Sequence, residues 1–347
     1  MSWQHTATHA LKRAGIARVA GFIAAAVVTV VLVLLPLSAT PFTNLQISLI
    51  AAYAVAIRGL GVLTGHAGQV SLAQSAFFGV GAYGAAYAAD HGWPAAVGLL
   101  LAVAVAALAG VLIAIPAVRL RGFAFGILTL AVPVVAVPLA NRLSGLTGGS
   151  QGKTAVLLPA PEWSGLADDQ WHYYVVLVIA ALIFLLVHNL LTGRFSRALD
   201  LLRANETVAA AMGVPVQRYK VIAFTISAAC GGAAGWLYLV PVRFISPDSL
   251  QLTLSISLLV ALVVGGVRSP IGAVVGATFY VLLPNFTDKV TPGRSYLFFG
   301  IALLIVLLFF PSGVTGGLRS LADRLFRKES SSPSAAAMSG SGEPFAE

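Results

Sequence analysis

The sequence predicts an all-α, polytopic integral membrane protein with about ten transmembrane helices, roughly eight to ten, and both termini in the cytoplasm. Hydrophobic residues make up 58% of the 347 residues and charged residues only 10%. Soluble domains carry about 25% charged residues, so this chain lacks the polar surface that a globule in water needs. Long apolar runs and an alternating distribution of basic residues indicate the same fold class.

Ten apolar runs are the expected spans, since a transmembrane helix needs roughly 17–25 mostly apolar residues. The first run follows Lys12, Arg13 and Arg18 and exceeds the apolar region of a signal peptide, so we expect an uncleaved helix. The fifth run contains Pro133 and Pro138, and the ninth is short. The expected spans are residues 19–37, 45–63, 69–89, 94–116, 123–141, 172–191, 219–240, 250–267, 270–284 and 295–311.

The basic residues alternate between the loops that join these spans. With the N-terminus in the cytoplasm, 15 of the 21 Lys and Arg residues fall in cytoplasmic segments and 5 in external ones, and Arg58 falls inside the second span. This excess on one side agrees with the rule that cytoplasmic loops are positive. Arg58 is expected near the inner end of its helix, with its side chain reaching the interface. A position facing a substrate is the alternative.

The chain divides into a cytoplasmic N-terminus (1–18), a transmembrane domain (19–317) and a cytoplasmic tail (318–347). The transmembrane domain includes one long cytoplasmic loop, residues 192–220. From residue 329 the tail is rich in Ser, Ala, Gly and Pro, which cannot form a packed core, so we expect it to be largely disordered.

Several kinds of chemistry are disfavoured. The basic residues flank membrane runs instead of forming a patch, so nucleic acid is not an expected ligand. The Gly-Lys-Thr at 152–154 lacks the first glycine of a phosphate-binding loop, because Thr147 stands in its place. The lone Cys230 is expected to be a packing residue. His66 has no second ligand at metal spacing, and we expect it to form a hydrogen bond at the interface. No metal site is predicted.

The spans also lack an ion-coupling group. No expected span contains Asp or Glu, which argues against a proton-driven carrier. Backbone carbonyls can bind sodium, so sodium coupling is disfavoured less strongly. If the protein pumps, its energy comes from a partner.

The basic loop 192–220 carries signals for two short helices. Ser196 is expected to cap the first, which has one apolar side formed by Ala198, Leu201 and Leu202. Asn205 is a good N-cap for the second, Glu206 suits its positive end, and Gly213 and Pro215 end it. Small residues, Ala209 to Ala211, would allow another surface to approach closely. Contact with a protein and contact with the lipid surface remain alternatives.

Glycine and serine residues interrupt two apolar segments, one before the third span and one before the ninth. Broken helices at matching positions often mark a transport site, whereas small residues also allow close helix packing. Packing is favoured for the second segment, with Gly231-x-x-x-Gly235 and Gly272-x-x-x-Gly276 as ordinary packing motifs, and both alternatives stay open for the first. The candidate pathway residues are Gly65, Gly68, Gln69, Ser71, Gly79 and Gly81.

From about residue 45 to 317 the chain resembles a known family, the membrane subunits of bacterial ABC importers for branched-chain amino acids, including their urea and short-amide relatives. The block GHAGQVSLAQSAFFGVGAYGAA resembles the family's G-x-x-G-Q-x-S-L-G pattern, with Ala73 in place of its last glycine. RLRGFAFGILTLA and LTGGSQG resemble the longer of two paired permease types. LLRANETVAAAMGVPVQRYK resembles the cytoplasmic coupling segment, and ISPDSLQLTLSISLLVALVVGG matches as well.

This resemblance implies a transport subunit of the bacterial inner membrane that has no catalytic site. It implies a second permease, homologous or identical, two cytoplasmic ATPases, a periplasmic substrate-binding protein and surrounding lipid as partners. The chain itself would bind no cofactor, since ATP and Mg²⁺ are used by the ATPases. The residues implied in ATPase coupling are Arg203, Glu206, Ala209, Ala210 and Gly213.

The expected cargo is a branched-chain or other hydrophobic amino acid. Urea or short-chain amides carried by the same machinery are the alternative within the family, because the sequence departs from the family pattern near the expected pathway. An ion-coupled secondary carrier is the alternative of a different class. A membrane enzyme is disfavoured, since the spans lack carboxylates and a His/Ser/Asp cluster.

Overall fold

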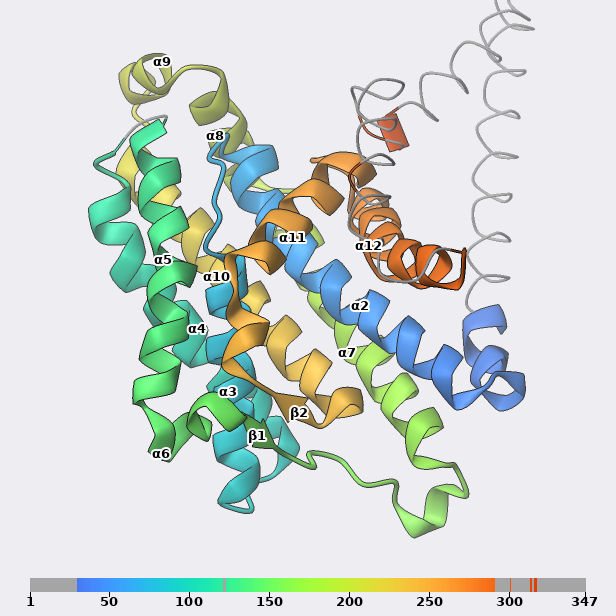
Figure 1. Cartoon of the computed structure of the whole chain (residues 1–347). Coiled ribbons are helices and arrows are strands. Elements are labelled where there is room, and N and C mark those ends of the chain that lie inside the picture. Colours follow the sequence, from blue (N-terminus) through green and yellow to red (C-terminus); the bar gives the residue numbers. More distant parts are fainter. Residues whose placement is uncertain (1–29, 121–122, 291–299, 301–312, 314, 317–347) are drawn as a thin grey trace, which may run out of the picture.

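Helices form most of the part of the protein that the computed structural model describes (Figure 1), which is residues 30–120 and 123–290, and residues 300, 313, 315 and 316. The N-terminus, the tail and most of the first and last expected spans lie outside the described residues. The first half of the described chain contains α2 (Pro41–Gly61), the π-helical turn η1 (Val62–His66), α3 (Gln74–Asp90), α4 (Ala95–Ala117), α5 (Phe123–Arg142), α6 (Ser144–Thr147), η2 (Gly149–Gln151) and β1 (Lys153–Thr154). The second half contains η3 (Glu162–Ser164), α7 (Asp168–Leu190), α8 (Arg194–Ala204), α9 (Glu206–Ala211), α10 (Val216–Val242), β2 (Phe244–Ile245), η4 (Pro247–Leu250), α11 (Leu252–Gly265) and α12 (Pro270–Val290).

The all-α membrane fold is confirmed. Within the described residues, five helices are long and apolar enough to cross a membrane, and each coincides with an expected span. They are Pro41–His66, Ala95–Ala117, Ala124–Arg142, Asp168–Leu190 and Val216–Val242. Three other expected spans correspond to α3, α11 and α12, but α3 begins at Gln74 instead of residue 69 because residues 68–73 form no regular secondary structure. The helix α11 is short because it follows the 3₁₀ turn η4 and stops at Gly266, whose φ is +112°.

The core lies around α10, which packs against α2, α3 and α4. Small residues allow this close approach. A Cβ atom on Gly235 would lie 2.0 Å from the Phe78 carbonyl oxygen, and one on Gly276 would lie 2.1 Å from the Ala261 carbonyl oxygen. Both Gly-x-x-x-Gly motifs therefore serve helix packing, as predicted. Cys230 is buried against Gly59, which confirms its role as a packing residue.

Alanine at Gly81 should destabilise the bundle, whereas alanine at Gly84 in the same helix should not. A Cβ on Gly81 would lie 2.3 Å from the Gly232 Cα, so the backbones of α3 and α10 must separate; at Gly84 the nearest atom is 3.6 Å away. Overpacking of this kind costs about 1–3 kcal/mol. Thermal unfolding of the purified protein in detergent, followed by size exclusion, measures the difference. Equal melting temperatures for G81A and G84A would contradict the packing.

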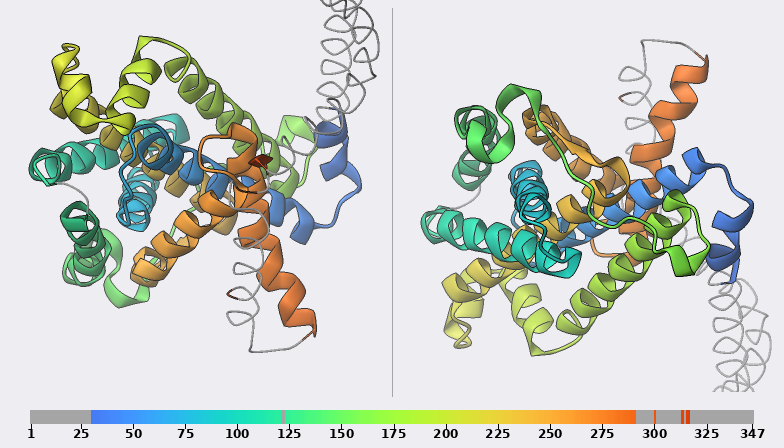
Figure 2. Two further views of the ribbon diagram at one scale, coloured as in Figure 1. Left: turned by 90° about the horizontal axis from the view of Figure 1, so that it is seen from above. Right: turned by 90° about the horizontal axis from the view of Figure 1, so that it is seen from below.

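The loops fall at two opposite ends of the bundle (Figures 1 and 2). The helices α8 and α9 lie at one end, and β1, β2 and α6 at the other. The strands pair antiparallel, with Lys153 opposite Ile245. At the same end Arg243 Nη2 lies 2.6 Å from Asp168 Oδ2. Segments that the charge pattern places on one side of the membrane thus lie together, which agrees with the predicted alternation of the described spans.

Candidate functional site

The loop 192–220 folds into α8 and α9, and the ends of α9 follow the predicted signals. The Asn205 side-chain oxygen accepts hydrogen bonds from the amides of Thr207 at 2.9 Å and Val208 at 3.2 Å, so Asn205 is the N-cap. Gly213 has φ +82°, a left-handed conformation that glycine adopts without strain. The chain then turns back into α10.

The start of α8 differs from the prediction. Ser196 lies inside the helix, which begins at Arg194 after the N-cap residue Gly193. The buried side consists of Ala198, Leu199 and Leu202, whereas Leu201 is exposed. The face is set by packing on α10, where the ring of Phe195 stacks on that of Tyr219 with centroids 5.7 Å apart. Leu199 and Leu202 follow Phe195 at helical spacing on that face.

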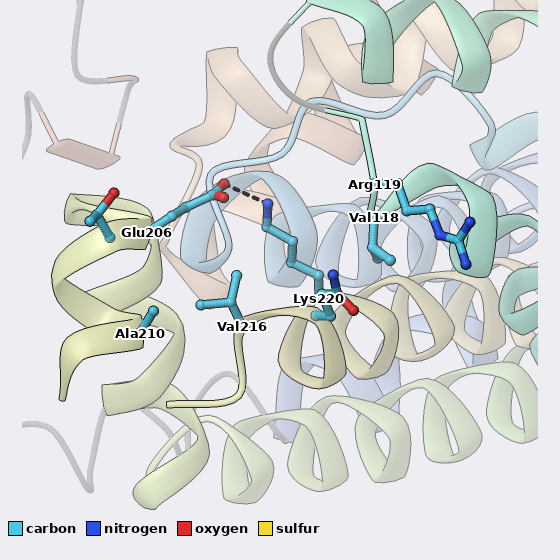
Figure 3. Close-up of a pocket in the computed structure, with 8 residues that line it drawn as sticks. Val118, Arg119, Glu206, Ala210, Val216 and Lys220 are labelled. Carbon is cyan, nitrogen blue, oxygen red and sulfur yellow. Dashed lines mark hydrogen bonds and ion pairs between the residues drawn. The ribbon is translucent and has the colours of Figure 1, made fainter. Parts of the chain in front are cut away.

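An ion pair fixes α9 against α10. Glu206 lies at the start of α9, and Lys220 Nζ is 2.5 Å from its Oε1 (Figure 3). The Lys220 side chain is only 2% exposed, so this charge is held inside the protein. The pair borders a cavity of about 410 Å³ that also reaches Val118 and Arg119, between α4 and α5. Lys220 was not among the predicted site residues, because no sequence periodicity relates it to Glu206 across the turn at Gly213.

The exposed side of α9 also differs from the prediction. Ala209 is 0% exposed and packs inward, whereas Ala210 and Ala211 face out. The large apolar side chains on the surface are Val208, 49% exposed, and Met212, 67% exposed. Their spacing of four residues, which places two side chains on one helix face, was the signal that could have identified them.

The loop contacts the break between α2 and α3. The guanidinium group of Arg203, in α8, donates a hydrogen bond to the carbonyl oxygen of Gly65 in the π-helical turn. Arg268 Nε donates to the same carbonyl at 3.1 Å, and Arg268 Nη2 donates to Asp200 Oδ1 at 2.8 Å. A Cβ on Gly68, which has φ +71°, would lie 3.0 Å from Arg203 Cγ. The structure therefore brings a predicted coupling residue onto two predicted pathway residues.

Gln69 shares this region, since a cavity of about 650 Å³ is lined by both Gln69 and Arg203. A helix broken at a π-helical turn often marks a functional site. The site is thus one unit formed by α8, α9 and the segment 61–73.

The other pathway candidates lie in the packed interior. Ser71 Oγ accepts a hydrogen bond at 3.3 Å from the amide of Ala73, the N-cap residue of α3. The Ser75 amide donates to Ser255 Oγ at 2.9 Å. Hydroxyl groups of the protein thus occupy this helix end, where an anion would bind. Gly79 and Gly81 closely approach Leu250 and α10, which favours packing at both.

Two basic side chains bear on the predictions, and Arg58 contradicts its prediction. Arg58 lies in the last turn of α2, as expected, but it is only 3% exposed, so its side chain does not reach the interface. The interpretation was wrong because α10 covers this part of α2, with Cys230 against Gly59. His66 Nδ1 lies 3.7 Å from Asp200 Oδ1, too far for a hydrogen bond, and it has no hydrogen-bond partner among the described residues.

Comparison with known proteins gives one matching family, described as the branched-chain amino acid transport system permease component, over residues 42–307. The high-affinity branched-chain amino acid transport system permease protein LivM of Escherichia coli is 29% identical over 288 residues, which cover 74% of this chain and 66% of LivM. The chain thus spans just under two thirds of that relative.

A second relative and one solved structure are more distant. The probable branched-chain amino acid transport permease protein LivM of Methanocaldococcus jannaschii is 26% identical over 62% of this chain and 68% of that protein. The structure titled PsaBC from Streptococcus pneumoniae in complex with Fab aligns with 78% of this chain and 92% of that chain, at 19% identity and a TM-score of 0.41. A likeness at this level carries no argument about function.

Proposed function

The chain belongs to the family of branched-chain amino acid transport system permease components, and from this premise we propose that it is the membrane permease subunit of an ATP-driven ABC importer. Its cargo is a branched-chain or another hydrophobic amino acid that moves into the cell across the bacterial inner membrane. A second permease completes the pathway, two cytoplasmic ATPases supply energy, and a periplasmic binding protein delivers the substrate. The chain holds no ATPase site of its own.

The observation that carries this proposal is the way α9 is mounted. It presents Val208 and Met212 outward at the end of the bundle, while the ion pair between Glu206 and Lys220 ties its base to α10. A helix that lies on lipid is rich in Lys or Arg, with Trp, Phe or Leu on its other side. The sequence of α9, Glu-Thr-Val-Ala-Ala-Ala, has none of these. This composition favours a protein partner over the lipid surface.

The mechanism follows from the contacts of α8. When ATP closes the partner ATPases, α9 and α8 move together as a short lever. Arg203 transmits this movement to the Gly65 carbonyl, at the break between α2 and α3. Because η1, which holds Gly65, directly follows α2 and α2 spans the bundle, a shift of the break changes the arrangement of the helices around the pathway. The permease then switches the side on which it is open.

Co-purification tests the proposed function. The full-length chain, tagged and purified from its native membrane in mild detergent, should bring down ATPase subunits and a second permease. Cells that lack the chain should lose uptake of labelled leucine, isoleucine or valine from dilute medium. Uptake of urea or acetamide in place of the amino acids would assign the importer to the other cargo. Purification of the chain alone, with ion-driven uptake, would assign it to the secondary carriers.

A further inference from the structure

A second cavity, of about 520 Å³, lies within the bundle between α2, α10, α11 and α12 and is separate from the site described above. Its lining includes Asp248, in η4, and Gln251, the N-cap residue of α11. It also reaches Ser257 in α11 and Tyr53 in α2. Sites for small molecules are usually clefts of roughly 300–1,000 Å³ that combine apolar walls with a few polar groups.

One wall of this cavity is a cluster of four aromatic rings. Tyr53 lies at its centre, with its ring centroid 5.9 Å from Phe78, 4.9 Å from Tyr280 and 6.1 Å from Tyr238. The rings come from α2, α3, α10 and α12, so the shape of the cluster depends on how these four helices lie relative to one another. Such a wall suits a branched aliphatic side chain, which gains dispersion contacts on the ring faces.

The rest of the lining contains several polar side chains and one charge. Polar side chains from η4 and α11 include Asp248, Thr253 and Ser257, and the cavity has no Lys, Arg or His in its described lining. Asp248 Oδ1 accepts a hydrogen bond from Gln251 Nε2 at 3.0 Å, which leaves the other carboxylate oxygen for a cation. The N-cap residue of α11, Gln251, makes no side-chain capping hydrogen bond, so the first amides of α11 suit a carboxylate beside that cation.

Another cavity in the same bundle is almost entirely apolar and serves as a comparison. It measures about 460 Å³, lies between α3, α4 and α5, and is bounded almost wholly by aliphatic and aromatic side chains such as Val80, Leu101 and Leu139. The cavity around Tyr53 differs by its acid and its amide and hydroxyl side chains. Lipid chains do not require these groups, whereas an amino acid zwitterion does.

We propose that the cavity around Tyr53 is the amino acid site of the permease, with the apolar side chain of the substrate among the four rings and its α-ammonium group on Asp248. This inference rests on the proposed function and deepens it. Tyr53 lies in α2, and the π-helical turn η1 that holds Gly65 continues α2 directly, so the cavity and the coupling contacts are joined by one helical segment, Pro41–His66. A movement of that helix opens or closes the ring cluster around the substrate.

The test uses the complete importer in cells that take up labelled L-leucine and L-alanine through it. S257F fills the cavity, and I256F, the matched control, places the same ring on the exposed side of α11. We expect S257F to reduce leucine uptake at least about tenfold and alanine uptake less, since a pocket separates side chains that differ in size by about 10–200-fold. I256F should match the wild type. Because the binding protein is the same in all strains, a changed leucine-to-alanine ratio reports on the permease.

A second variant tests the charge. D248N keeps the shape of the exposed side chain and should raise the KM for leucine at least about tenfold, since a charge-assisted hydrogen bond is lost. The amount of each variant in the membrane and of co-purified ATPase corrects for assembly. If S257F does not assemble, the smaller S257L takes its place.

The outcomes separate the two proposals. If the wild-type importer takes up no amino acid, the proposed function is wrong. If it takes up leucine and both S257F and D248N behave as I256F does, the cavity is not the substrate site, although the importer function stands. Equal losses of leucine and alanine uptake in S257F would contradict the placement of the side chain among the rings.

Discussion

Replacing Glu206 by glutamine should reduce amino acid uptake at least about tenfold, while the partner ATPases continue to hydrolyse ATP. Glu206 is the partner that the structure describes for Lys220 Nζ, and Lys220 is 2% exposed. Removing one member of a buried ion pair costs about 3–5 kcal/mol, because the other charge stays buried without compensation. Glu206 is partly exposed, so the lower end of this range applies. We expect α9 to leave its position and to stop transmitting movement to α8.

A double-mutant cycle tests whether the ion pair itself is responsible. K220M removes the buried charge and keeps a long side chain, so E206Q combined with K220M should recover most of the uptake that E206Q loses. Uptake and ATP hydrolysis are measured on the same reconstituted complex. If the double variant is as defective as the sum of the two single variants, the pair does not hold α9 in place.

Replacing Met212 by aspartate should abolish the binding of the ATPases. Met212, the C-cap residue of α9, is 67% exposed and follows Val208 by four residues. A carboxylate buried without a partner in an apolar contact costs several kcal/mol, enough to remove a central contact of an interface. The measurement is the ratio of ATPase to permease after purification through a tag on this chain.

The control for this prediction is Gln217→Glu, which introduces the same charge at an exposed position in the first turn of α10. It should leave the ratio of ATPase to permease unchanged. A normal ratio for M212D would show that α9 does not bind the ATPases. A low ratio for both variants would show that any added negative charge near this end has the same effect.

The features that could be predicted from the sequence are those that depend on residues close to one another in the chain. Length and apolarity located the described spans, and the Asn205 cap and Gly213 located the ends of α9. The alternation of basic residues predicted which loops lie together. Each of these depends on residues close in the chain, so a reading of local patterns suffices.

The remaining features depend on contacts between distant residues. Lys220 lies beyond a turn from Glu206, and the Arg203 side chain reaches Gly65, far away in the sequence. Arg58 was misjudged because its burial is caused by α10. Ala209 faces inward because α9 packs against the bundle. A helix of six residues is too short for its sequence periodicity to show which face is buried. The ring cluster around Tyr53 joins four helices, and it became visible only in three dimensions.

The central claim is that α9 passes the movement of partner ATPases to a pathway inside this chain. Its most direct test is leucine uptake into proteoliposomes that contain the complex purified through this chain. The account predicts uptake that requires ATP on the side of α8 and α9, that persists when ionophores collapse all ion gradients, and that E206Q reduces at least about tenfold. Uptake by this chain alone, driven by an ion gradient without ATP, would contradict it.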